Sequence, residues 1–235
     1  RIRYDRIEPD GSKRFGAAVA AALFLFAVLT AIDVSVCSAA PAPVLPRYEI
    51  VDLGTLGGAY SSAYGINERG QIVGVSETAA GRLHAFVWDK NTGMIDLGTL
   101  GGSVSRAHAI NNIGQIVGRA RTTNNELHAF LWERGNMIDL GLLPVGSCTE
   151  AMAINDAGQV AGNARTSATI YTSQRAFSWQ KGTMIDLGSL DAGANGGAAD
   201  INIRGQVVGT SGENAFLWQS AGGMQALATG LPTSQ

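Results

Sequence analysis

Residues whose side chains could bind a ligand or act in catalysis occur at the same place in each of four repeats, just before a repeated Ile-Asn pair. The segments that end there read SSAYGIN, SRAHAIN, TEAMAIN and GGAADIN. The polar, charged and bulky residues that vary between them form the candidate ligand-binding site: Tyr64, Arg106, His108, Glu150, Met152 and Asp200. Histidine and carboxylates are also the usual acids and bases of enzymes. The alternative is drift at solvent-exposed positions.

Three linked motifs recur around these residues and must position them. The motif INxxGQxxG begins at Ile66, Ile110, Ile154 and Ile201, so successive copies are 44, 44 and 47 residues apart. The motif xAFxW begins at His84, His128, Arg175 and Asn214. The motif (V/I)DLG places its aspartates at Asp52, Asp96, Asp139 and Asp186, with a degraded copy, MQAL, at Met224. Periods of this size are typical of solenoids, propellers and arrays.

Each motif predicts a piece of β-structure. In INxxG, asparagine opens a four-residue turn and glycine accepts the positive φ that closes it, so the turn joins two antiparallel strands. The xAFxW and MIDLG motifs predict a third and a fourth strand. No helical apolar period of sufficient length occurs. We therefore predict an all-β, β-propeller-like array of four four-stranded repeats.

The near-continuous apolar runs in these strands indicate that each sheet is covered on both faces. One phenylalanine and one tryptophan occur at the same place in every repeat, which indicates packing between neighbouring sheets. The loop between the second and third strands varies most in length, and variable loops on a rigid scaffold often carry binding. The first strands are expected to line a central channel, which would place the candidate site there.

The first part of the chain is a different kind of sequence. Residues 15–32 are apolar or small apart from Thr30, follow Lys13 and Arg14, and precede a small-residue and proline stretch. This predicts an export signal, with a permanent membrane anchor as the alternative. We assign residues 1–40 to the signal or anchor, 41–47 to a linker and 48–235 to the repeat domain. Cys148 is then the one cysteine of the exported chain, either buried or paired between molecules.

Composition and motifs narrow the chemistry. The net charge of −2, a pI of about 5.9 and 15% charged residues argue against nucleic-acid binding. His84 and His128 are replaced by arginine and asparagine in later copies, so their position is interpreted as polar and exposed. The DLG aspartates stand alone, unlike a calcium loop, and are expected to cap turns. No hydrolase motif occurs, and we predict no metal, no cofactor and no defined catalytic residues.

The succession of INxxGQxxG, HAFxW and MxDLGTLGG resembles the extracellular HAF repeat family of bacterial proteins, from Tyr48 to about Leu227. The resemblance implies an exported or surface protein with a propeller-like fold, and it implies no particular activity or site residue. The later copies depart from the pattern, because Arg175 and Asn214 replace the histidine of HAF and Ala226 replaces the last aspartate.

Two functions remain open at this point. The first is an exported, non-enzymatic binding scaffold, secreted or at the cell surface (extracellular or periplasmic). Its ligand would be an envelope component, a polysaccharide or a protein, and it would touch a membrane only through an uncleaved first segment. The second is an exported polysaccharide-acting hydrolase or lyase with Arg106, His108, Glu150 and Asp200 around the channel. A purely structural role in a surface array is a third reading.

Overall fold

The computed structural model describes residues 48–144, 146–165 and 174–227. Within these ranges the chain forms strands, turns and loops but no helix, and hence no helix that could span a membrane. The expected export signal and the linker 41–47 lie outside the described residues. All described strands belong to one compact unit, which begins at Leu53.

Four antiparallel sheets of four strands make up this unit, and each sheet is one repeat of the sequence. The first sheet comprises β1 (Gly57–Ile66), β2 (Ile72–Thr78), β3 (Leu83–Asp89) and β4 (Gly93–Asp96). The second comprises β5 (Gly101–Ile110), β6 (Ile116–Thr122), β7 (Leu127–Glu133) and β8 (Asn136–Asp139). The third comprises β9 (Cys148–Ile154), β10 (Val160–Arg165), β11 (Gln174–Gln180) and β12 (Thr183–Asp186). The fourth comprises β13 (Gly196–Ile201), β14 (Val207–Ser211), β15 (Asn214–Gln219) and β16 (Gly223–Ala226).

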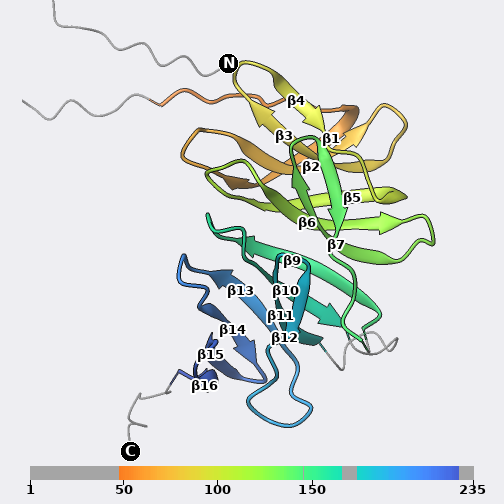
Figure 1. Cartoon of the computed structure of the whole chain (residues 1–235). Helices are drawn as coiled ribbons and strands as arrows, with labels where there is room; N and C mark the ends of the chain where they lie inside the picture. Colours follow the sequence, from red (N-terminus) through yellow and green to blue (C-terminus); the bar gives the residue numbers. More distant parts are fainter. Residues whose placement is uncertain (1–47, 145, 166–173, 228–235) are drawn as a thin grey trace, which may run out of the picture. The chain divides into compact units, whose positions relative to one another are not determined.

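Strands within each sheet are hydrogen-bonded in chain order, as the motifs predict (Figure 1). The turn between the first two strands confirms the interpretation of INxxG. In the first sheet, Gly70 N donates to Asn67 O (2.9 Å), and Gly70 has a φ of +74°. The Asn67 Oδ1 atom accepts from the amides of Arg69 and Gln71 at 3.1 and 3.0 Å. One asparagine side chain therefore holds its whole turn.

The sheets pack face to face, and each joint between consecutive sheets holds its own apolar core. The first strand of each later sheet packs on strands of the sheet before it. The repeated phenylalanines are fully buried, as expected of packing residues: Phe86, Phe130, Phe177 and Phe216. Three of the repeated tryptophans pack against these cores: Trp132, Trp179 and Trp218. Covering both faces of a strand explains its continuous apolar sequence.

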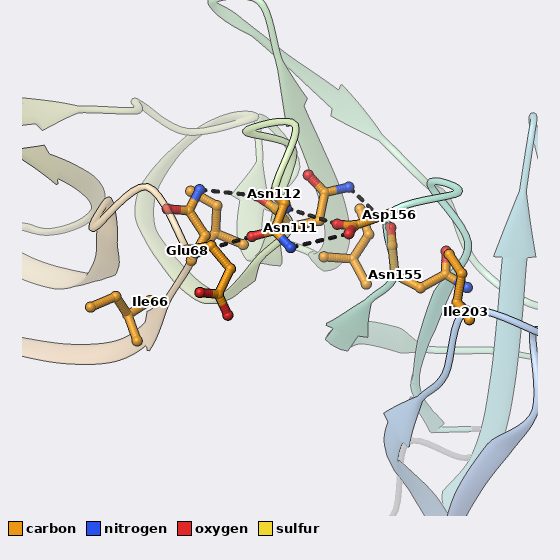
Figure 2. A pocket seen from close by; sticks show the side chains of 10 residues that line it. Ile66, Glu68, Asn111, Asn112, Asn155, Asp156 and Ile203 are labelled. Carbon is orange, nitrogen blue, oxygen red and sulfur yellow. Dashed lines mark hydrogen bonds between the residues drawn. The ribbon is translucent and has the colours of Figure 1, made fainter.

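A row of asparagine side chains links the INxxG turns, and we call Asn67, Asn111, Asn155 and Asn202 the asparagine ladder; Figure 2 labels Asn111 and Asn155. The Asn67 Nδ2 atom donates to Asn111 O at 3.1 Å. The Asn111 Nδ2 atom donates to Asn155 O at 3.0 Å, and Asn155 Nδ2 donates to Asn202 O at 2.8 Å. Each turn is thus bonded to the turn one repeat further along the chain.

Extensive packing in the described part of the chain joins consecutive sheets only, so the first and fourth sheets do not close a ring. Among the described strands β16 pairs only with β15.

The ladder predicts that its middle asparagines stabilise the fold more than its last one. Asn111→Ala removes bonds within the turn and the bond to the next sheet from a buried position, and we expect a loss of about 2–3 kcal/mol in the free energy of unfolding. Asn202→Ala is the matched control, because Asn202 holds its own turn in the same way without a following sheet. We expect it to cost about 1 kcal/mol. Denaturant unfolding of both variants measures the difference, and equal losses would contradict a role between sheets.

Candidate functional site

Each first strand carries one residue more than its partner strand at the same place. In the first sheet, Ala63 pairs with Gly74 and Gly65 pairs with Val73, which leaves Tyr64 without an opposite residue. The equivalent residues of the other sheets are His108, Met152 and Ala199. Bulges of this kind change the direction in which a side chain points and often lie next to functional sites. Half of the predicted site residues are thus bulge residues.

The last glycine of INxxGQxxG is required by this bulge. A Cβ atom built on Gly118 would lie 2.0 Å from Arg106 O, much closer than real side chains approach a carbonyl. The same approach recurs, with distances of 2.0 to 2.3 Å, at Gly74, Gly162 and Gly209. A glycine at this point of every repeat lets the carbonyl of the neighbouring strand come in, and the bulge follows from it.

Because the first strands of consecutive sheets lie beside one another, residues from different repeats meet there. The guanidinium carbon of Arg106 lies 5.5 Å from the ring centre of Tyr64, a cation–π contact. The Tyr64 and His108 rings are 5.9 Å apart and tilted by 36°. The His108 Nε2 atom lies 2.7 Å from Glu150 Oε1. The structure therefore brings together four of the six predicted site residues.

Arg119 completes this group, and we call Tyr64, Arg106, His108, Arg119 and Glu150 the Glu150 cluster. The Arg119 NH1 atom donates to Glu150 Oε2 at 3.1 Å, and Arg119 lies opposite Arg106 in the sheet. Sequence reasoning missed Arg119 because it considered only the first strands. The signal was present, since the residue after the last motif glycine also varies between copies: Val75, Arg119, Asn163 and Thr210.

The electrostatics of the cluster centre on Glu150. Burial raises the pKa of its carboxyl, but the contact with His108 and the positive charge of Arg119 outweigh burial, so that the pKa lies below its usual value. The His108 Nε2 atom is buried and lies 2.7 Å from Glu150 Oε1, and this contact is the largest of the effects that lower the Glu150 pKa. Glu150 is consequently an ionised group that holds two cationic or polar neighbours in place.

Met152 and Asp200, the other two predicted residues, do not join this cluster through any described contact. Met152 is half-buried on β9, and the residue that would face it in the next repeat is Gly197, which has no side chain. The place is filled by Asn163, whose Oδ1 atom accepts from Ala198 N at 2.8 Å. Asp200 is exposed, and its Oδ1 atom accepts from the adjacent Ile201 amide. The row of varied residues therefore stops at the third joint.

The xAFxW and DLG positions form a structural pair instead of a site. The Nδ1 atoms of His84 and His128 lie 2.8 Å from carboxylate oxygens of Asp96 and Asp139, and both imidazoles are largely buried. The interpretation of this histidine position as exposed is therefore wrong. The capping role expected for the aspartates is confirmed, since Asp96 Oδ1 accepts from Gly98 N at 2.8 Å. Asp139 and Asp186 do the same in their turns.

A hollow of about 340 Å³ lies among the INxxG turns and is drawn in Figure 2. Asn67, Asn111 and Asn155 of the asparagine ladder form part of its wall, and Glu68, Asn112 and Asp156 line it from the exposed ends of the turns. Glu68 N donates to Asn112 Oδ1 and Asn112 N donates to Asp156 Oδ1, so these polar groups are already paired with one another. Among the described residues, no group of three or more histidine, cysteine or acidic side chains is arranged to hold a metal ion. The Glu150 cluster is therefore the better candidate site.

Comparisons with known proteins bear on the fold. No protein-family model and no curated protein matches the sequence. The β-propeller domain of the Trilobed protease from Pyrococcus furiosus, described as having an open velcro topology, is similar with 15% identity and a TM-score of 0.51, over 73% of this chain and 57% of that one. TolB from Acinetobacter baumannii gives 12% identity and a TM-score of 0.47, over 71% and 44% of the two chains. An Aleuria aurantia lectin mutant, solved with Fucα1-6GlcNAc, gives 14% and 0.43, over 74% and 64%.

The four sheets and the likeness to the protease domain define the class of protein: this chain is an all-β, β-propeller-like array of four four-stranded repeats. It spans a little over half the length of that propeller chain. At such low identity the likeness concerns the fold alone. The function is inferred from the Glu150 cluster.

The bulge predicts an unusual sensitivity at Gly118. Gly118→Ala forces a methyl group against the Arg106 carbonyl, and we expect a loss of about 2–3 kcal/mol in the free energy of unfolding. Gly98→Ala is the control, because Gly98 has a φ of +76° but open space around its Cβ position. Its left-handed backbone alone should cost about 1 kcal/mol. Thermal unfolding measures both, and a tolerated Gly118→Ala would contradict the packing described for the bulge.

The charges around Glu150 predict a pH effect. Because the folded-state pKa is lowered, the Glu150 contacts stabilise the fold above the unfolded pKa of about 4.3 and stop doing so as the pH falls through the folded value. Arg119→Met removes one of the lowering charges, so NMR titration should show a higher Glu150 pKa in this variant. The stability difference from the unmodified chain should shrink below pH of about 4. Arg82→Met, at an exposed arginine, should leave the Glu150 titration unchanged.

Proposed function

We propose that this chain is an exported, non-enzymatic binding scaffold of the extracellular HAF repeat type, acting at the cell surface or outside the cell. The Glu150 cluster carries the proposal: side chains from the first three repeats meet at residues that vary between copies, on a backbone that the repeats keep constant. The basic and apolar pattern of residues 13–32 supports export. The linked INxxGQxxG, xAFxW and DLG motifs support the family.

The ligand is expected to present an anionic group. Arg106 and Arg119 contribute two positive charges and Glu150 one negative charge, so these three side chains carry a net charge of +1. No described carboxylate forms an ion pair with Arg106, whose guanidinium is held against Tyr64. A guanidinium fork binds carboxylates in a bidentate way, and Tyr64, which is partly exposed, offers a ring face beside it. Acidic polysaccharides of the envelope and acidic protein segments both present such groups.

The same cluster argues for binding over glycoside hydrolysis. Glycoside hydrolysis normally needs two acidic residues, one of which keeps a raised pKa in order to donate a proton. Glu150 is the one carboxylate of the cluster, and its pKa is lowered by His108 and Arg119 in spite of burial. An ionised, doubly contacted carboxylate serves to orient cations, which suits recognition.

The proposal predicts saturable binding that depends on Arg106. The purified chain is titrated against an acidic polysaccharide (polygalacturonate), a neutral polysaccharide (dextran) and proteins of the bacterial envelope, with calorimetry and product analysis in parallel. Arg106→Ala should weaken binding to the acidic ligand about tenfold or more, the effect of losing one charge-assisted bond. His108→Ala and Glu150→Gln should weaken it too, by releasing Arg119 and the rings from their positions.

Arg82→Ala is the matched control, since Arg82 is an exposed arginine away from the cluster. Equal losses of affinity in Arg82→Ala and Arg106→Ala would mean that binding depends on the overall positive charge of the chain and not on the Glu150 cluster. Turnover of the polysaccharide, lost in Glu150→Gln, would replace the proposal with the enzymatic reading. A folded chain that binds none of the three ligand classes would contradict the assignment of the cluster.

A further inference from the structure

Each of the three joints buries one face of a sheet against one face of the next sheet. The first and the fourth sheets each have an outer face, and these two faces carry the same residue positions as the two sides of a joint. Every joint has a trailing face from one sheet and a leading face from the next. The trailing face includes the second residue of the second strand and the leucine of DLG; the leading face includes the alanine of the first strand and the isoleucine of INxxG. At the two ends of the array these sets have no described partner sheet.

The exposure of equivalent residues shows the difference. On the leading side, Ile66 of the first sheet is 67% exposed, whereas Ile110 and Ile201 are 9% and 7% exposed. On the trailing side, Val208 of the fourth sheet is 38% exposed, whereas Val117 of the second is fully buried. Ala63, Ala215 and Leu227 are likewise exposed where their counterparts in the inner joints are buried, whereas Phe86, the counterpart of Phe130 on the leading side of the first sheet, is fully buried.

The asparagine ladder also has a donor on one outer face and an acceptor on the other that no described residue of another sheet pairs. In the first three repeats, the ladder asparagine donates both to its own turn and to the next asparagine carbonyl. Among the described residues, Asn202 Nδ2 donates only to Gln206, at 2.8 Å, and so has a further N–H available on the trailing side. Asn67 O accepts from Gly70, and no described residue of another sheet donates to it as happens at the carbonyls of Asn111, Asn155 and Asn202.

A second polar contact crosses the first two joints, from a backbone amide of the trailing face to a side-chain hydroxyl of the leading face. Ala85 N donates to Ser105 Oγ at 2.8 Å across the first joint, and Ala129 N donates to Thr149 Oγ1 at 2.9 Å across the second. Ser61 holds the corresponding hydroxyl on the outer leading face, already directed by its bond to Gly54 O. Ala215 holds the corresponding position on the outer trailing face.

We propose that the trailing face of the fourth sheet binds the leading face of the first sheet in a second copy of this chain, head to tail. In the third joint Gly196 stands in place of the hydroxyl residue, but in the first two joints the leading face combines an inner-strand alanine, an isoleucine, a hydroxyl and an asparagine carbonyl in one spacing. This chain itself presents that set on its first sheet, at Ser61, Ala63, Ile66 and Asn67. Each contact joins two different faces, and in a closed pair the same contact is made twice, related by a two-fold axis. Two copies contribute eight sheets, which lies within the range of closed propellers, so a closed pair is the expected assembly.

The test is sedimentation velocity of the full chain over a range of concentrations, with one charged substitution on each outer face. Ile66→Asp and Val208→Asp should each weaken self-association about tenfold or more, since each places a carboxylate in the apolar centre of the contact. Both residues are exposed in the single chain, so the variants should fold, which circular dichroism checks. Ile138→Asp, at an exposed isoleucine of the outer strand β8, is the matched control and should associate like the unmodified chain.

Mixing the two variants gives the decisive result. Each retains the face that the other has lost, so an equimolar mixture should form one-to-one pairs although neither variant associates alone. Loss in only one variant would indicate contact between identical faces and overturn the proposal. It is also overturned if the unmodified chain stays monomeric at its highest soluble concentration, or if association survives in both variants, as attachment through residues 1–47 would produce.

Discussion

The side-chain amide of one asparagine per repeat is the interaction on which the rest of this structure depends. Its oxygen holds the turn between the first two strands, and its nitrogen reaches the backbone of the next turn. A single residue therefore fixes the local hairpin and the position of the following sheet at once. With the sheets placed in this way, the apolar faces meet over their whole width and the first strands come to lie beside one another.

Much of this fold could be predicted because it depends on short stretches of sequence. The INxxG turn needs an asparagine and a glycine at fixed spacing, and the DLG aspartate bonds an amide two residues further on. The strands, their order and the burial of the phenylalanines follow from the same motifs. The bulge could not be predicted in this way, because strict alternation of faces has no place for the additional residue at Tyr64 or His108.

The sequence predicted four of the five residues of the Glu150 cluster, missed one, and added two residues that do not belong to it. Variation between copies identified Arg106, His108 and Glu150, which do meet. The same criterion also selected Met152, for which the fourth repeat supplies only glycine at position 197, and Asp200, which is exposed and bonds the adjacent Ile201 amide. Arg119 was missed because only the register of β5 with β6 places it opposite Arg106. Contacts between repeats are set by the offset of neighbouring strands, and no single repeat contains that information.

The joints between sheets also bear on how such a chain can change in length. The third and fourth asparagines are 47 residues apart and the first two 44, yet the ladder bond is kept at 2.8 and 3.1 Å. The three additional residues are therefore accommodated away from the joint. Since every joint uses the same faces, duplication or deletion of a whole repeat in the gene would leave a compatible neighbour on each side. The unit on which selection acts in this architecture is the complete repeat, and new binding surfaces arise wherever two repeats with different first strands become adjacent.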